Sequence, residues 1–252
     1  MADWSALQDE LRIWRSEGLT LPLWWRDDDA VSHTPALDQM LARARHLNMP
    51  VHIAVIPKHA DQSLVDLVLN EPKLVPLVHG WAHENHATQG RKKAEFGEQR
   101  ASLLGDASAA IEQMKALFGT AFAEVFVPPW NRIDPDLIPH LPALGYHALS
   151  TFTPRTTRLP VAGLAQINTH VDPINWRGGA GLLAPDTLVF RLIQHLQDRR
   201  QGRADAAEPL GMLTHHLVQD AETWAFTQDC LSCLLDAGAV PLNLYGAKDA
   251  LP

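Results

Sequence analysis

The stretch LPLWWRDDDAVSH (residues 21–33) places an arginine and three consecutive aspartates directly after an apolar run. Such a run, rich in aromatic and aliphatic residues, predicts a buried β-strand. Side chains alternate between the two faces of a strand, so Asp28 would share the face of Arg26 and Asp29 would take the opposite one. If Asp28 and Asp29 are both to serve one site, the backbone must leave regular strand geometry by about Asp28.

The rest of the chain repeats this pattern of apolar runs separated by segments with helical period. The expected strands are LPLWWR, PVHIAVIP, KLVPLVHG, AEVFVPPW, YHALSTF, LAQINTHV, PLGMLTHH and AVPLNLY. The expected helices cover residues 35–47, 61–70, 95–118, 134–144, 185–201 and 220–237. Buried strands that alternate with helices predict a parallel sheet covered by helices, and about seven or eight such units suit a closed or nearly closed α/β barrel. No repeat or long linker divides the chain, so residues 1–252 are expected to form a single domain with a motif-bearing core at about 22–217.

Composition and charge exclude several classes of protein. The formal net charge of -8 argues against a nucleic-acid binder, which usually carries a basic surface. The N-terminal segment contains acidic residues and no uninterrupted apolar core, so no signal peptide is expected. No segment reaches the length of a transmembrane helix, and the expected location is the cytoplasm. The basic cluster GRKKAEF (residues 90–96) is typical of a solvated turn or a helix start.

Polar residues follow several of the predicted strands directly in the sequence. In a parallel barrel, the carboxyl ends of the strands carry the active site. The segments at these positions are RDDD (26–29), HGWAHENH (79–86), PPWNR (128–132), HVDPINW (170–176) and THH (214–216). They are rich in Asp, His and Trp, so residues that are distant in the sequence are expected to converge at one end of the barrel.

Three histidines in this set predict a metal site. His79, His83 and His86 are spaced so that a helical turn would place all three on one face. Two imidazoles four residues apart often bind a transition metal, as in H-E-x-x-H zinc proteases, but here Gly80 follows the first histidine. A third ligand must come from elsewhere, and Asp29 is well placed at the end of the first strand. His86 is expected to pack or to lie outside the ligand set, and surface histidines are the alternative for the whole cluster.

The order of these motifs resembles a known family. Asp-Asp, H-x-x-x-H, Pro-Pro-aromatic, Asp…Trp and Leu-x-His are similar to the motifs of the polysaccharide deacetylases, the NodB-homology group also called carbohydrate esterase family four. The resemblance runs from about residue 22 to 217. It implies a distorted (β/α)7 barrel of the NodB-homology type and the removal of N- or O-acetyl groups from sugars with a divalent metal. Zn²⁺ is the expected metal, with Co²⁺, Ni²⁺ or Mn²⁺ as alternatives.

The resemblance also assigns a role to each motif. It makes Asp28 the general base and His215 the general acid. The implied metal ligands are Asp29, His79 and His83. Oxyanion and substrate contacts would come from Pro129, Trp130, Leu213, Trp81 and Trp176, and the three tryptophans could stack on sugar rings.

Four positions depart from the family's pattern: Ala30, Gly80, Val127 and Asn175. At the positions of Val127 and Asn175, the family carries an arginine and an aspartate that support the base, and both are missing here. Arg26, two residues before Asp28, is expected to supply the guanidinium, and Arg132 is the rival candidate. Asp172 and Asn175 are further candidates for a supporting role.

The predicted function is a metal-dependent hydrolase that removes an N-acetyl, or alternatively an O-acetyl, group from a carbohydrate. Metal-activated water would attack, with Asp28 as base and His215 as acid. Without a signal peptide, the expected substrates are soluble oligosaccharides or lipid-linked or nucleotide-linked sugars instead of cell-wall polymers. The alternatives are a deformylase or cyclic-imide hydrolase with the same site, or a non-catalytic carbohydrate-binding relative. The sequence gives no signal for an oligomeric state.

Overall fold

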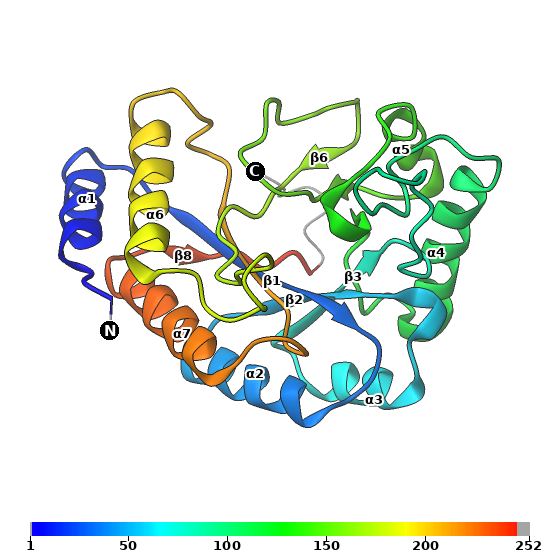
Figure 1. Cartoon of the computed structure of the whole chain (residues 1–252), viewed down its shortest axis with the longest axis horizontal. Coiled ribbons are helices and arrows are strands. Elements are labelled where there is room, and N and C mark those ends of the chain that lie inside the picture. Colours follow the sequence, from blue (N-terminus) through cyan, green and yellow to red (C-terminus); the bar gives the residue numbers. More distant parts are fainter. Residues whose placement is uncertain (1, 246–252) are drawn as a thin grey trace.

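A parallel sheet at the centre of the molecule contains all eight predicted strands (Figure 1). In the computed structural model, which describes residues 2–245, the sheet has the order β6-β5-β4-β3-β2-β1-β7, and β8 pairs with β1. The strands are β1 (Pro22–Ala30), β2 (Val51–Val55), β3 (Leu74–His79), β4 (Val125–Val127), β5 (Ala148–Leu149), β6 (Ala165–Gln166), β7 (Leu210–Thr214) and β8 (Val240–Pro241). Since every pair is parallel, all the strands end at the same edge.

The sheet curls into a barrel that closes through irregular chain. Beyond β6, Thr169 forms a parallel bridge with Phe152, and Val171 forms one with Met212 of β7. The N–H of Leu213 donates to the carbonyl of Val171 at 2.8 Å. The protein therefore has the predicted distorted (β/α)7 barrel, with the segment after β6 in place of a regular closing strand.

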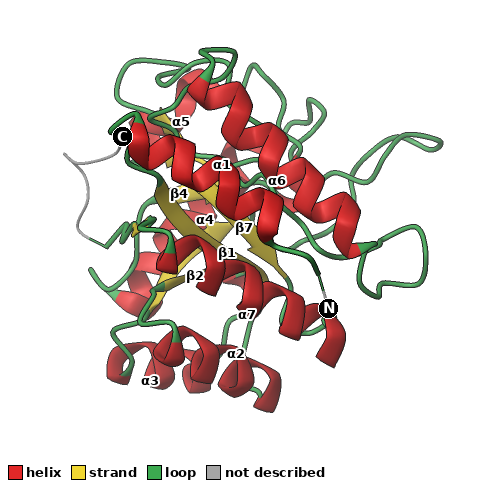
Figure 2. Ribbon diagram, turned by 90° about the vertical axis from the view of Figure 1, so that its left-hand side faces the viewer, coloured by secondary structure: helices red, strands yellow, loops and turns green. Residues whose placement is uncertain are grey.

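Helices surround the outer face of the sheet (Figure 2). They are α1 (Ser5–Ser16), α2 (Pro35–His46), α3 (Gln62–Asn70), α4 (Leu103–Phe118), α5 (Leu141–Leu144), α6 (Pro185–Arg200) and α7 (Ala221–Asp236), with 3-10 turns η1 (Pro57–His59), η2 (Pro129–Asn131) and η3 (Ile138–His140). Three of them begin with a side-chain cap, because Thr34, Asp61 and Asp220 accept hydrogen bonds from N–H groups of α2, α3 and α7.

Two helix predictions were wrong in part. Residues 95–102 are not helical, because Phe96 is buried and bridges Ile133 in an extended conformation. Residues 134–144 form only short turns, since their prolines interrupt a regular helix. The sequence analysis also missed α1, which lies beside α6 in both views and is joined to it by an ion pair between Glu10 and Arg200 (Figures 1 and 2).

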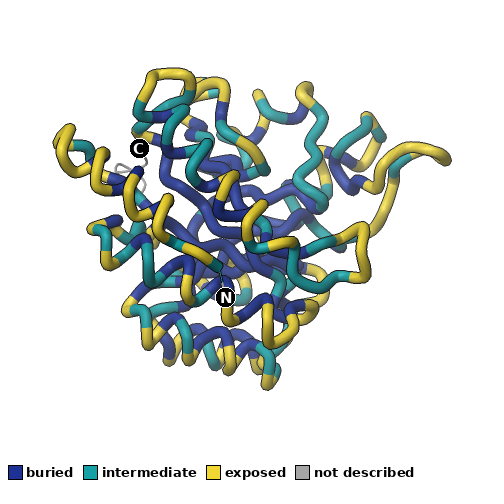
Figure 3. Tube along the Cα trace, turned by 60° about the vertical axis from the view of Figure 1, so that its left-hand side comes forward, coloured by how far each residue is buried: buried dark blue, intermediate teal, exposed yellow. Residues whose placement is uncertain are grey.

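The alternation of side chains along β1 separates two apolar cores. Trp24 packs inside the barrel with side chains of β2 to β6, whereas Trp25 packs outside it, against the helices. Both rings are fully buried, so they fill the core and do not line a cleft. Figure 3 shows this buried centre under an exposed shell. The same alternation sends Arg26 and Asp28 into the barrel and Asp27 outward. Within residues 2–245, no helix is long and apolar enough to cross a membrane.

Candidate metal centre and active site

Asp27 lies in a buried network outside the barrel. His216 Nδ1 forms an ion pair with one oxygen of Asp27, and the Thr214 hydroxyl donates to the other. Trp25 Nε1 donates to the same hydroxyl at 2.8 Å. Burial lowers the pKa of His216, but the charge of Asp27 outweighs it and the net pKa is raised. Asp27 and His216 therefore stabilise the fold and do not face the site.

Asp28 is held inside the barrel by Arg26. Arg26 Nε donates to Asp28 Oδ1 at 2.9 Å and Nη2 donates to Oδ2 at 3.0 Å. The guanidinium is fully buried, and Asp28 is 3% exposed. Ser150 Oγ accepts from Nη1, and Asn131 Oδ1 accepts from Nη2, both at 2.7 Å. This bidentate geometry fixes the carboxylate and offsets the cost of burying two charges.

Of the two candidate arginines, only Arg26 contacts Asp28. Arg132 Nη1 instead donates to the carbonyl of Lys93, on the loop that follows β3. Asn175 does not reach the base either: its N–H donates to the Gly181 carbonyl at 2.7 Å, within its own loop. Asn175 therefore shapes that loop and does not support Asp28.

Asp29 turns away from the regular strand toward the barrel mouth. Its φ of 77° is left-handed, and the pairing register of β1 with β2 shifts between Asp27 and Ala30. This β-bulge confirms that the backbone leaves regular strand geometry near Asp28, and it lets consecutive aspartates serve one site. Asp29 Oδ1 lies 3.1 Å from His79 Nε2 and 3.2 Å from His83 Nε2.

These three residues form a donor set that fits a divalent metal. One ligand atom from each of Asp29, His79 and His83 lies within 4.8 Å of the others. His79 Nδ1 donates to the Val127 carbonyl at 3.0 Å, which leaves the Nε2 lone pair directed at the cluster. A backbone acceptor on the far nitrogen is the usual way in which proteins orient a metal-binding imidazole. Two imidazoles and one carboxylate also leave coordination positions open, as catalytic zinc sites do.

The carboxylates and the His79 imidazole of this cluster stabilise each other's charged forms. Burial raises the pKa of Asp29, but the hydrogen bond and charge of His79, with smaller contributions from other histidines, lower it well below the usual value. Burial lowers the pKa of His79, yet the carboxylates of Asp28 and Asp29 outweigh it and the net pKa is raised. Burial and the charge of His79 lower the pKa of His83. The two carboxylates thus create a field that attracts a cation.

A loop without a helical turn brings His83 to the cluster. Residues 80–90 contain no helix, and His83 has a left-handed φ of 57°. His86 is exposed on this loop and lies outside the ligand cluster. The i, i+4 spacing therefore brings His79 and His83 together through a loop and not through one face of a helical turn.

Glu95 holds this loop, and the sequence analysis did not identify it. Its buried carboxylate accepts hydrogen bonds from the N–H groups of Trp81, Ala82 and His83 at 3.2, 2.7 and 3.2 Å. Burial raises the pKa of Glu95, although these hydrogen bonds oppose the rise. The only signal in the sequence is an acid between two apolar residues in GRKKAEF, which does not reveal its partners.

Gly80 is required by the same arrangement. Its φ is +56°, and a Cβ at this position would lie 2.3 Å from Glu95 Oε2 and 2.5 Å from Pro129 Cδ. This departure from the pattern of the family that the sequence resembles therefore has a steric reason in this chain. A side chain would displace the carboxylate that orders the loop.

Pro129 and Trp130 form the wall next to His83. Pro129 is buried, and the Trp130 ring lies 4.2 Å from the His83 ring. Trp130 has a left-handed φ of 56°, which is unusual for a bulky residue. Within the described chain, no acceptor engages the Trp130 N–H, so this donor is available at the mouth of the barrel.

His215 lies on the opposite side, directly after β7. It is half-buried, and its Nδ1 has no hydrogen-bond partner among the described residues. The Trp176 ring meets the His215 ring edge to face at 4.8 Å, and Trp176 Nε1 donates to Asp172 Oδ2 at 2.7 Å. Burial raises the pKa of Asp172, and the charge of His215 partly opposes this. Leu213 is buried and pairs with Arg26 in the sheet, so it shares the inward face.

Known structures share this fold. No protein-family model matches the sequence, and neither does any curated protein. A family 4 carbohydrate esterase from Streptomyces lividans, solved with acetate, aligns with a TM-score of 0.53 and 14% identity over 88% of this chain and 92% of its own. The chitin deacetylase from Colletotrichum lindemuthianum aligns with a TM-score of 0.53 and 13% identity over 89% of this chain and 86% of its own. A mutant of a family 4 pseudoenzyme with restored activity aligns with a TM-score of 0.57 and 12% identity over 91% of this chain and 68% of its own. At these identities, the similarity shows the barrel fold of family 4 esterases.

Proposed function

We propose that this protein is a metal-dependent hydrolase that removes an acetyl group from an acylated carbohydrate. The observation that carries this proposal is the juxtaposition of the Asp29, His79 and His83 donor set with Asp28, a carboxylate braced by a guanidinium. Known structures with this fold include a chitin deacetylase and a carbohydrate esterase, which supports the same class of reaction.

The metal would be held by Asp29 Oδ1, His79 Nε2 and His83 Nε2, and Zn²⁺ suits these ligands best. When bound, such an ion supplies Lewis acidity, which lowers the pKa of water and polarises the acyl carbonyl. The nearby Asp28 carboxylate accepts the proton of the attacking water, and Arg26 keeps it in place.

Residues on the other walls complete the reaction. The free N–H of Trp130 donates to the oxygen on which negative charge develops. His215 donates a proton to the departing amine of the sugar. Trp176 and Asp172 hold the His215 ring in position from the side. The exposed face of Trp176, 52% accessible, is available to stack on a sugar ring.

The decisive experiment is elemental analysis of the purified protein beside His79→Ala, His83→Ala and, as a matched control, His86→Ala. We expect about one metal ion per chain in wild type and His86→Ala, and its loss in both other variants. Wild type that neither contains metal nor takes up added Zn²⁺, Co²⁺, Ni²⁺ or Mn²⁺ would overturn the proposal.

Substrate assays would then separate the candidate reactions. N-acetyl and N-formyl sugars and a cyclic imide should be tested with wild type, Asp28→Asn and His215→Gln. Release of acetate that stops in both variants supports a deacetylase, whereas release of formate or opening of the imide identifies one of the alternative hydrolases. Metal-loaded protein that binds sugars and hydrolyses none of these compounds would be a carbohydrate-binding relative.

A further inference from the structure

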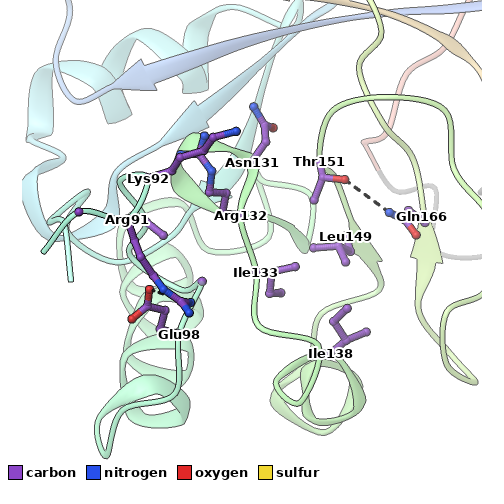
Figure 4. A pocket seen from close by; sticks show the side chains of 13 residues that line it. Arg91, Lys92, Glu98, Asn131, Arg132, Ile133, Ile138, Leu149, Thr151 and Gln166 are labelled. Atoms are coloured by element: carbon purple, nitrogen blue, oxygen red, sulfur yellow. Dashed lines mark hydrogen bonds and ion pairs between the residues drawn. The ribbon is translucent and has the colours of Figure 1, made fainter. Parts of the chain in front are cut away.

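A cavity of about 750 Å³ lies beside the site, next to residues that form hydrogen bonds with the Arg26 guanidinium (Figure 4). Asn131 and Thr151 line it, and both accept hydrogen bonds from the Arg26 guanidinium, at 2.7 and 3.4 Å. One layer of side chains therefore separates this cavity from the Asp28 carboxylate. Asn131 and Arg132 of this lining directly follow Trp130, so the cavity adjoins the wall of the candidate site.

The cavity has an excess of positive charge. Arg91, Lys92 and Arg132 line it, together with one acid, Glu98, which pairs with Arg91 at 3.4 Å. Among residues 2–245, no carboxylate forms an ion pair with Lys92 or Arg132. Figure 4 shows these two side chains at the same end of the cavity as Asn131. This excess is notable because the chain as a whole carries a formal net charge of -8.

A hydrogen bond joins the two segments that carry Lys92 and Arg132. Arg132 Nη1 donates to the carbonyl of Lys93, which ties the loop that carries Lys92 to the segment after β4. Both cations face a cavity in which two or more charged donors can meet one anion, an arrangement that protein sites use for phosphate and carboxylate groups. An unpaired pair of like charges costs free energy in the empty cavity, and a bound anion relieves that repulsion.

The remaining walls suit the rest of a sugar. Ile133, Ile138 and Leu149 form an apolar surface that can contact the face of a ring. Gln166 and Thr151 lie beside Leu149 and are joined by a hydrogen bond of 3.5 Å, so this side of the cavity also offers polar atoms to hydroxyl groups (Figure 4).

We propose that this cavity binds an anionic group, a phosphate or a carboxylate, of the acylated sugar substrate, with Lys92 and Arg132 as its ligands. This inference rests on the proposed hydrolase function and narrows its substrate class to charged amino sugars or their conjugates. It also gives the basic cluster at residues 90–96, expected from the sequence to be a solvated turn, a role in recognition.

The test compares N-acetylglucosamine with N-acetylglucosamine 6-phosphate and an N-acetylated hexosaminuronic acid. With metal-loaded protein, we expect kcat/KM for a charged compound to exceed that of the neutral sugar at least tenfold and to fall as salt is raised. In the double variant Lys92→Gln/Arg132→Gln, this charged-to-neutral ratio should fall about tenfold, mainly through KM. Lys115→Gln, an exposed lysine on α4, should leave the ratio unchanged. The charged compound that wild type prefers distinguishes phosphate from carboxylate recognition.

Binding measured apart from turnover keeps the two proposals separable. Calorimetry with the same compounds on the Asp28→Asn variant reports affinity without hydrolysis. A preference for the charged sugar that disappears in Asp28→Asn/Lys92→Gln/Arg132→Gln supports the cavity even if no compound is hydrolysed by wild type. Equal affinity for neutral and charged sugars, or a preference that survives loss of both cations, would overturn the inference, because the anion would then bind elsewhere, such as at the metal.

Discussion

Arg26 and Asp28 point from the same strand into the barrel, and the guanidinium of the first grips the carboxylate of the second through two hydrogen bonds of 2.9 and 3.0 Å. In the family that the sequence resembles, an arginine before the Pro-Pro pair supports the base, but Val127 occupies that position here. A guanidinium two residues upstream on β1 reaches the same carboxylate, because residues i and i+2 of a strand share a face.

Arg26→Lys should therefore impair turnover more than substrate binding. Lysine keeps the charge, but it cannot span both carboxylate oxygens or hold Asn131 and Ser150 at the same time. We expect kcat to fall roughly 10²-fold, as for other misplaced catalytic groups. Steady-state kinetics beside a thermal unfolding scan would measure this. Arg132→Gln is the comparison, and an equal effect of both variants on kcat would contradict the assignment.

Glu95→Gln should weaken metal binding although Glu95 is not a ligand. The amide keeps the shape of the side chain, but its NH2 group faces N–H donors, so the loop that carries His83 loses part of its support. Loss of such a supporting group typically costs 10- to 100-fold in metal affinity. A competition titration against a chromophoric chelator would measure the change, with Glu112→Gln on the exposed face of α4 as the control. Unchanged affinity would mean that the loop is held by other contacts.

Gly80→Ala should cost more stability and more metal affinity than Gly18→Ala. Both glycines have a left-handed φ, +56° and +70°, so both variants incur a similar backbone penalty of about 1 kcal/mol. Only at Gly80 does the new Cβ meet other atoms, at 2.3 Å from Glu95, whereas nothing lies within 4 Å at Gly18. Urea unfolding and metal titration of both variants would separate strain from steric clash. Equal losses at both positions would show that the contact with Glu95 is unimportant.

The free energy of unfolding should decrease as the pH falls from about 6.5 to about 4. Burial lowers the pKa of His170 to about 4, although the nearby Glu208 carboxylate opposes this, and the Nδ1 of the neutral ring accepts a hydrogen bond from the Gly211 N–H. The unfolded chain takes up this proton at higher pH than the folded chain, so stability present above pH 6.5 is lost on acidification. The effect is roughly 3 kcal/mol for one group.

Urea unfolding at a series of pH values would test this, with His170→Asn as the comparison, since its amide oxygen can replace the Nδ1 acceptor. The free energy of unfolding of the variant should depend less steeply on pH. The pH dependence that remains is expected from His52, whose pKa burial also lowers to about 4. A slope that does not change in His170→Asn would exclude His170 as the source.

The sequence determined the architecture because its signals are local. Continuous apolar runs separated by helical periods define a parallel barrel, and the alternation within one strand placed Asp28 on the face of Arg26. The histidine spacing, the position of Asp29 at a strand end and the family resemblance together selected Asp29, His79 and His83, whose ligand atoms the structure brings within 4.8 Å of one another. Strand ends converge in any parallel barrel, so no long-range detail was needed for this step.

The tertiary structure decided what depends on contacts between distant segments. It shaped the segment after β3 into a loop, in which Glu95 supplies a buried acceptor for three N–H groups. It chose Arg26 over Arg132, since only Arg26 lies inside the barrel within reach of Asp28. It also turned a solvated basic cluster into one wall of a cavity. Hydrogen bonds and charges act over a few ångströms in space, and sequence spacing does not encode which distant groups will meet at that range.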